Sequence, residues 1–280
     1  MSPICSNSRT SAIPTGFEPQ RDGQAVGNGS KMTSQVNLER RAASERAFFA
    51  SWASHPYGDE LRLRRELALL LRARPGGLGE VLSLGCGRGR LERAMAQQAD
   101  WVLGIDSSPE SIEDARRTAA REGSAKARFE CADVLDLSLD RRFDTVVCIG
   151  FLHHLTEDES IALLRRIRDH LRPGGLLHTQ DPSSRGILRR LGRRVLGDRY
   201  DAYHTEDERE LDPGSVRALV LEAGFAKAEI RYMDFCLIPG MQLFARAPRF
   251  LMTAFHEIDR ALCALPTAPL ASGFAVEGTR

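Results

Sequence analysis

The stretch Val-Leu-Ser-Leu-Gly-Cys-Gly-Arg-Gly at residues 81–89 decides the fold of this chain. Its apolar, β-forming start leads into a turn that contains Gly85, Gly87 and Gly89, and a helical pattern begins at Leu91. Glycine at alternate positions lets the backbone turn sharply and approach a ligand, because no Cβ stands in the way. The amide groups that begin the next helix then face the turn. The stretch therefore predicts a strand–turn–helix unit that holds a ligand in its turn.

A second strand predicts what kind of ligand this is. The apolar run Trp-Val-Leu-Gly-Ile at 101–105 ends in Asp106, which stands seventeen residues past Gly89. An acid at the end of the second strand of such a unit is placed to accept hydrogen bonds from ribose hydroxyls. The glycines and the acid together predict a ligand that carries a ribose.

Five motifs follow one another in an order that identifies a family. They are LSLGCGRG (82–89), the acid Asp106, Cys-Ala-Asp-Val (131–134), FDTVVCIGFLHHL (143–155) and LRPGGLL (171–177). With them the chain resembles the class I S-adenosylmethionine (SAM)-dependent methyltransferases over roughly residues 60–235. A dinucleotide-binding unit also has glycines and an acid, but its spacing is G-x-G-x-x-G, whereas this chain has G-x-G-x-G.

The resemblance implies that SAM is the cofactor and S-adenosylhomocysteine (SAH) the product. The residues implied to bind it are Gly85, Cys86, Gly87 and Gly89 at the methionine portion, Asp106 and Ser107 at the ribose, Asp133 and Val134 at the adenine, and Ile149 with the backbone of Gly150 closing the site. The other interpretation of Asp133 is a simple turn residue. Ser83 stands where the family often has an acid, which weakens or removes an indirect contact to the amino-acid portion of SAM.

Alternating strand and helix patterns predict an α/β fold, a doubly wound, Rossmann-like sheet of seven mostly parallel strands with a helical N-terminal extension and two insertions that form a lid. The expected parts are a disordered segment at 1–34, helices covering the cofactor site at 35–75, the SAM-binding core at 76–182, a lid insertion at 183–211, the core continued at 212–235, an apolar lid or dimerisation insertion at 236–271, and the last strand and tail at 272–280.

Methyl transfer is an in-line displacement that needs alignment, exclusion of water and at most one base. His153 and His154 follow the fourth strand, and two interpretations are open. In one, His153 faces the transferable methyl group as a base or positions the acceptor; in the other, both histidines brace the loop by hydrogen bonds. His204 is a second candidate base, and Asp181 and Tyr57 are further ones.

The sequence excludes several acceptors and partners. The fourth strand ends in Ile-Gly-Phe-Leu at 149–152 rather than in the Asn/Asp-Pro-Pro-aromatic run of enzymes that methylate amines of bases, and a net charge of +1 gives no basic field for nucleic acid. A pair of glutamates for a guanidinium and a carboxylate set for a magnesium-bound catechol are also missing. Six cysteines without C-x-x-C or His/Cys spacing predict no metal site.

The two insertions keep alternatives open. Six arginines lie among apolar residues at 185–199, a pattern typical of a basic amphipathic helix. Such a helix makes a weak contact with an anionic membrane or binds an acidic acceptor. The same pattern is also typical of a lid helix with one solvated face. The apolar residues of 236–271 are core, a homodimer face or the wall of a pocket for a lipophilic acceptor.

The resemblance implies a methyltransferase. We expect it in the cytoplasm, because the sequence shows neither a bilayer-length apolar run nor a signal peptide. We expect its acceptor to be a small, largely apolar molecule such as a natural product, a quinone or a lipid-like compound, methylated on oxygen. Methylation of carbon or nitrogen, another reaction at SAM, and a regulatory SAM-binding role are the alternatives.

Overall fold

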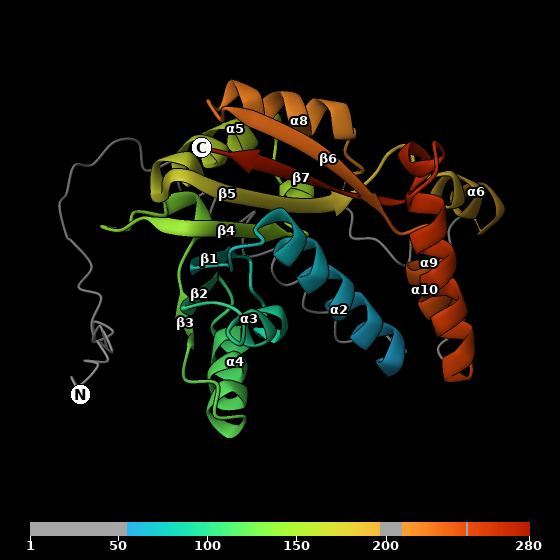
Figure 1. Cartoon of the computed structure of the whole chain (residues 1–280), viewed down its shortest axis with the longest axis horizontal. Helices are drawn as coiled ribbons and strands as arrows, with labels where there is room; N and C mark the ends of the chain where they lie inside the picture. The colour runs from blue at the N-terminus through green and yellow to red at the C-terminus, as the bar shows by residue number, and fades with distance from the viewer. Residues whose placement is uncertain (1–54, 197–208, 245) are drawn as a thin grey trace, which may run out of the picture. The chain divides into compact units, whose positions relative to one another are not determined.

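The computed structural model describes residues 55–196, 209–244 and 246–280, which form a seven-stranded sheet with helices on both faces (Figure 1). The strands are β1 (Glu80–Leu84), β2 (Trp101–Asp106), β3 (Ala127–Cys131), β4 (Phe143–Ile149), β5 (Leu171–Pro182), β6 (Lys227–Met233) and β7 (Gly273–Thr279). The helices are α2 (Pro56–Ala73), α3 (Arg90–Met95), α4 (Pro109–Arg121), α5 (Glu157–His170), α6 (Ile187–Leu196), α8 (Pro213–Glu222), α9 (Leu237–Leu243) and α10 (Arg249–Cys263). The predicted disordered segment 1–34, the helical pattern before residue 55 and His204 lie outside the described residues.

The strand order is β3-β2-β1-β4-β5-β7-β6. Neighbouring strands are parallel except at β7, which runs antiparallel to both β5 and β6. The chain builds outward from β1 to β3 and then crosses to β4, so the winding reverses between β1 and β4. Open α/β sheets bind ligands outside the carboxyl ends of the strands at such a reversal. The predicted doubly wound, mostly parallel sheet is confirmed, as is a last strand within 272–280.

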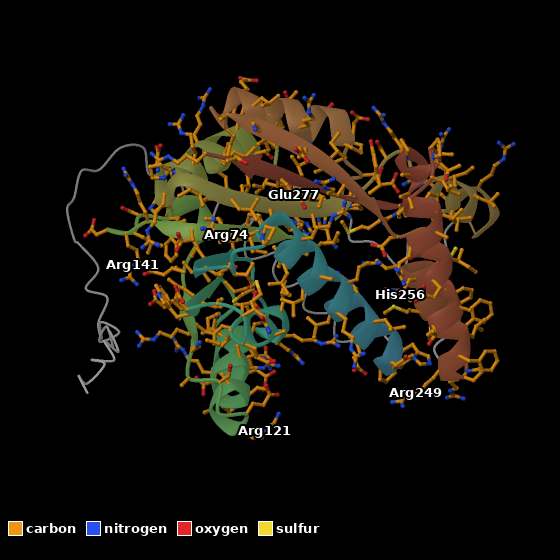
Figure 2. All side chains as sticks on the ribbon, in the orientation of Figure 1. Arg74, Arg121, Arg141, Arg249, His256 and Glu277 are labelled. Carbon is orange, nitrogen blue, oxygen red and sulfur yellow. The ribbon has the colours of Figure 1, made fainter. Side chains whose placement is uncertain are left out.

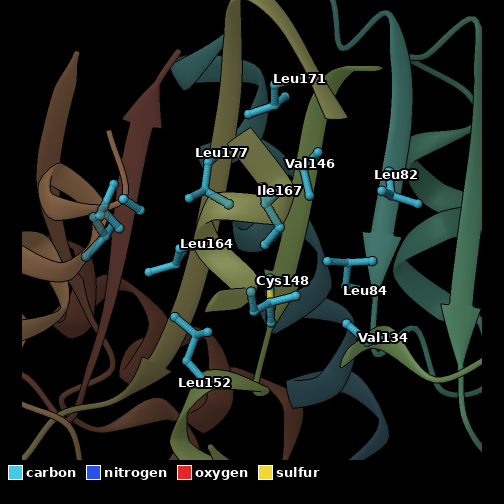
Figure 3. Packing of buried hydrophobic residues seen from close by; sticks show 14 of the residues in the cluster. Leu82, Leu84, Val134, Val146, Cys148, Leu152, Leu164, Ile167, Leu171 and Leu177 are labelled. Carbon is cyan, nitrogen blue, oxygen red and sulfur yellow. The ribbon is translucent and has the colours of Figure 1, made fainter. Parts of the chain in front are cut away.

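Apolar side chains hold helices to both faces of the sheet. Leu164 and Ile167 of α5 belong to one buried cluster with Val146 of β4 and Leu177 of β5 (Figure 3), and α8 completes this layer. Helices α2, α3 and α4 supply a second buried cluster on the opposite face. Each fully buried leucine or isoleucine contributes about 1.5–3 kcal/mol. Because β4 is covered on both faces, nearly all of its residues are apolar.

Capping side chains start the helices where the sequence predicts them. Ser108 caps α4 with Pro109 at the first helical position, and Asp212 caps α8 in the same way. Thr156 and Glu159 form both hydrogen bonds of a capping box at the start of α5. The acids at 157–159 therefore have a structural explanation in the dipole of α5.

The second insertion is fixed to α2. Its helices α9 and α10 share a buried apolar cluster with α2, and Figure 1 shows α10 running beside α2. Arg65 of α2 lies 2.5 Å from Asp234, which precedes the insertion, and both side chains are nearly buried. Asp259 of α10 accepts hydrogen bonds from the backbone N–H groups of Phe235, Cys236 and Leu237. Charged and apolar contacts thus hold 236–271 against the N-terminal helix.

The first insertion leaves β5 and contains α6. Ser183 and Leu211 form a β-bridge, which brings the two ends of the insertion together. Ile187, Leu188 and Leu191 of α6 are exposed. None of the helices in the described parts of the chain combines the length and apolar character needed to cross a bilayer.

Candidate functional site

The glycine turn after β1 lies at the reversal of the sheet, and its glycines have different surroundings. At Gly89 a Cβ would stand 2.3 Å from the ring of Phe129, so this glycine is required by packing. At Gly87 the backbone has a φ of +51° and a Cβ would meet no atom within 4 Å. Gly87 is therefore the glycine of the turn that borders open space, where a ligand can approach the backbone.

Asp106 joins the turn to the end of β2. One carboxylate oxygen accepts a hydrogen bond from Gly87 N at 2.8 Å, and the other accepts one from Ser108 N at 2.9 Å. Each carboxylate oxygen has two lone pairs, so both retain capacity for ribose hydroxyls. Ser107, which follows, is exposed. Asp106 thus holds the turn in shape and keeps acceptors beside it.

Cys86 is engaged by the protein itself. Its N–H donates to Ile105 O at 3.1 Å, and its side chain lies over Gly104, where a Cβ would meet Sγ at 2.9 Å. Burial raises the pKa of its thiol. Any contact between Cys86 and SAM stays a prediction, while the structure places the residue in the scaffold of the turn.

The residues predicted for the adenine and for closure of the site lie on the neighbouring loops. Asp133 caps a short 3₁₀ turn by accepting a hydrogen bond from Leu135 N at 2.8 Å, as its turn-residue interpretation requires. Val134 is buried in the sheet core, so only its backbone can reach a ligand. Ile149 is half-buried at the end of β4, and Gly150 N donates to Gln180 O at 2.7 Å.

His153 and Asp181 form a buried pair where β4 and β5 end. The ring nitrogen Nδ1 of His153 lies 3.0 Å from Asp181 Oδ1, and the backbone N–H of His153 donates to the same oxygen at 3.2 Å. Burial raises the pKa of Asp181. When Asp181 is ionised it only accepts, so Nδ1 of an unprotonated ring then donates to it and Nε2 keeps its lone pair. The pair can therefore orient Nε2 to take a proton.

The other candidate bases lie apart from this pair or beside it. The half-buried ring of His154 stacks at 3.9 Å, between centroids, on that of His153. The Tyr57 hydroxyl lies 3.3 Å from Thr253 Oγ1, and Arg249 lies over the Tyr57 ring at the start of α10 (Figure 2). The structure thus brings Asp181 to His153 and turns Tyr57 toward α10.

A buried carboxylate behind the turn was missed by the sequence analysis. Glu92 of α3 is 3% exposed, and its Oε1 accepts a hydrogen bond from Ser83 Oγ at 2.6 Å. Burial raises the pKa of Glu92 to about 7. The absence of an acid at position 83 was the only signal that pointed toward this place.

Residues 81–175 match the model of a family described as methyltransferase domain, and they contain the turn, Asp106 and His153. Over these residues the chain carries a methyltransferase domain. Ubiquinone biosynthesis O-methyltransferases of Coxiella burnetii (strain RSA 493 / Nine Mile phase I) and Xanthomonas campestris pv. campestris (strain 8004) are 32% and 36% identical to it. These alignments cover 35% and 38% of this chain but only 41% and 43% of the relatives' length.

Solved methyltransferases share the fold. Magnesium protoporphyrin IX methyltransferase from Synechocystis PCC 6803 with bound SAH has a TM-score of 0.56 at 16% identity and covers 90% of this chain and 99% of its own. The DhpI–SAH complex has a TM-score of 0.53 at 22% identity, with 89% and 95% covered. SAM is the cofactor of this methyltransferase family, and the open backbone at Gly87 beside the acceptors of Asp106 fits it.

Proposed function

We propose that the protein transfers the methyl group of SAM to a hydroxyl oxygen of a small, largely apolar acceptor. The observation that carries the proposal is the His153–Asp181 pair, which lies next to the reversal of the sheet that holds the glycine turn. An amine nitrogen already carries a free electron pair and has less need of such a base. The matched relatives, named as O-methyltransferases of ubiquinone biosynthesis, support oxygen as the attacked atom over the part that aligns.

The residues of the chain account for the proton and the orientation of the acceptor. SAM, when bound, supplies an activated methyl group on sulfur and leaves as SAH. Nε2 of His153 takes the proton of the acceptor hydroxyl as its oxygen bonds to the methyl carbon. Asp181, hydrogen-bonded to Nδ1, holds the ring in place and stabilises the imidazolium that results. Because Asp181 is buried, this stabilisation is little screened by water.

The apolar character of the acceptor is supported by the two insertions. Figure 1 shows α6 and α9 on the side of the sheet toward which β4 and β5 run. Both insertions expose large apolar side chains. They include Ile187 and Leu191 of α6, Phe250 of α10, and Phe244, which follows α9. An apolar surface beside polar, orienting groups is typical of a site for a small apolar ligand.

The proposal is tested with purified protein, SAM carrying a labelled methyl group, and phenols, catechols and hydroquinones that bear an alkyl tail. We expect a labelled methyl ether, and His153→Ala to lower kcat by about 10²–10⁴ with the affinity for SAH unchanged. His154→Ala, which removes the stacked neighbour, is the matched control. A loss below about fivefold in His153→Ala would return both histidines to a loop-bracing role.

A second acceptor separates a base from a structural histidine. A plain phenol, whose pKa is about 10, keeps its proton in a mildly alkaline assay. A nitro-substituted phenol is already ionised under the same conditions. The defect of His153→Ala should be large with the phenol and should shrink with the nitrophenol. An equal defect with both acceptors would contradict proton removal by His153.

A further inference from the structure

The carboxylate of Glu92 occupies an unusual place for a charged group. It lies on the third residue of α3, directly behind the glycine turn, and reaches back to Ser83 in β1. Ser83 stands two residues before Gly85, and its side chain is 3% exposed, as is that of Glu92. The two side chains thus form a polar contact between the strand and the helix that enclose the turn.

The carboxylate of Glu92 lies within the field of Arg93 but is not paired with it. Within residues 55–196, 209–244 and 246–280, no basic side chain makes an ion pair with it. The neighbouring Arg93 pairs with Glu122 at 2.8 Å, and Arg62 pairs with Glu66 at the same distance. Burial of an unpaired carboxylate is costly, so such a group marks a place where a ligand supplies the missing charge.

Other acceptors lie in the same region. Glu66 of α2 is close enough for its charge to act on Glu92, and Gln180 Nε2 donates to Glu66 Oε1 at 3.5 Å. Gln180 is 6% exposed, and its Oε1 has no hydrogen-bond partner among the described residues. A buried acceptor without a donor among the described residues, next to carboxylates, leaves a place for a ligand that brings N–H donors.

We infer that Glu92 receives the ammonium group of the methionine portion of SAM, with Ser83 holding the carboxylate in place. The inference rests on the proposed function, because it deepens how that cofactor is held. An ammonium carries three donors and one positive charge, which is what Glu92 and Gln180 lack. The sulfonium, the other cationic group of SAM, would have to face the acceptor for methyl transfer, which leaves the ammonium for the inner side of the turn.

This assignment corrects the expectation for Ser83. Serine at that position was expected to weaken the contact to the amino-acid portion of the cofactor. Glu92 brings a carboxylate to the same place from the helix instead of from the strand. The charge at this point is therefore retained, although it comes from a different element.

The test compares two ligands that differ in the amino-acid portion. Calorimetry measures the affinity of the full chain for SAH and for 5′-methylthioadenosine, which has the same nucleoside and sulfur but no ammonium. Glu92→Gln should weaken SAH by about 10- to 150-fold, the range of a hydrogen bond to a charged group, and leave methylthioadenosine within about twofold. Glu222→Gln, which removes an exposed carboxylate at the end of α8, is the control and should change neither affinity.

A second variant moves the charge back to the strand. Adding Ser83→Asp to Glu92→Gln should restore most of the SAH affinity, because a carboxylate then stands at the same place. Unchanged SAH affinity in Glu92→Gln, or an equal loss for both ligands, would overturn the inference, since the latter is the behaviour of a residue that only shapes the turn. Failure of the wild-type chain to bind either ligand would refute the proposed function itself, which is a distinguishable result.

Discussion

Replacement of Glu92 by glutamine should make the ligand-free protein more stable at alkaline pH. Burial raises the pKa of this carboxyl from 4.5 to about 7 in the folded chain. Below pH 4.5 the group is protonated in both states, and it then resembles glutamine. Between pH 4.5 and about 7 the folded state holds a proton that the unfolded state has released, so the stability of the wild type falls as pH rises.

The size of the effect follows from these two pKa values. A pKa shift of one unit between the unfolded and the folded state corresponds to 1.36 kcal/mol. A shift from 4.5 to about 7 therefore lowers the free energy of unfolding of the wild type by about 3 kcal/mol above pH 7. Glu92→Gln keeps the shape and the contact with Ser83 but carries no charge. We therefore expect the free energy of unfolding of the variant to exceed that of the wild type by about 3 kcal/mol at pH 8–9 and by almost nothing near pH 4.5.

Urea unfolding of both proteins without ligand, measured from pH 4.5 to 9, gives this difference. Other buried groups titrate too, among them His178, whose pKa burial lowers to about 4, but they cancel between the two proteins. Glu222→Gln, at the exposed end of α8, serves as the control and should not reproduce this gain in stability at alkaline pH. Addition of SAH should stabilise the wild type more than Glu92→Gln. A variant that is less stable than the wild type at pH 8 would refute the reasoning.

Three further outcomes are expected from other contacts. Asp106→Ala should weaken SAH binding in calorimetry by about 10- to 150-fold, because the ribose loses a charged acceptor and the turn loses its bond to Gly87. Arg65→Ala should cost about 3–5 kcal/mol in urea unfolding, since it leaves buried Asp234 unpaired. If 183–211 and 236–271 form a mobile lid, their amides should exchange faster than those of β1 and β4 and slow when acceptor binds; equally slow exchange would show them to be fixed core.

Much of the fold could be predicted because its signals are local. A buried parallel strand needs a continuous apolar run, and β4 has one. Helix starts carry caps, and Ser108 and Thr156 provide them in sequence. The strand β5 was harder, because Pro173-Gly174-Gly175 interrupts a pattern that is strand on both sides. The apolar run after these glycines predicts a strand over 176–180, but β5 runs over Leu171–Pro182, with a register shift opposite β4 between Phe143 and Thr145.

The His153–Asp181 pair could be predicted only in part. The two residues are 28 positions apart: Asp181 lies at the carboxyl end of β5, and His153 lies in the short 3₁₀ turn Leu152–His154 that follows β4. Neighbouring parallel strands bring these ends together, so the order β4-β5 places the side chains within reach. Neither residue alone indicates the contact, which is why Asp181 was only a further candidate. The pair follows from the sheet order, whereas the proton transfer remains a proposal about chemistry.

The contact between Ser83 and Glu92 follows from the geometry of the glycine turn, although no single motif contains it. The residues are nine positions apart, one before the turn and one after it, and the turn folds the helix back onto the strand that it leaves. A short side chain in β1 leaves space that a longer one from α3 fills. A carboxylate can therefore reach this place from either element, and two sequences that differ at both positions can present the same charge to a ligand. Position 83 alone predicts a lost contact, whereas positions 83 and 92 taken together predict a retained one.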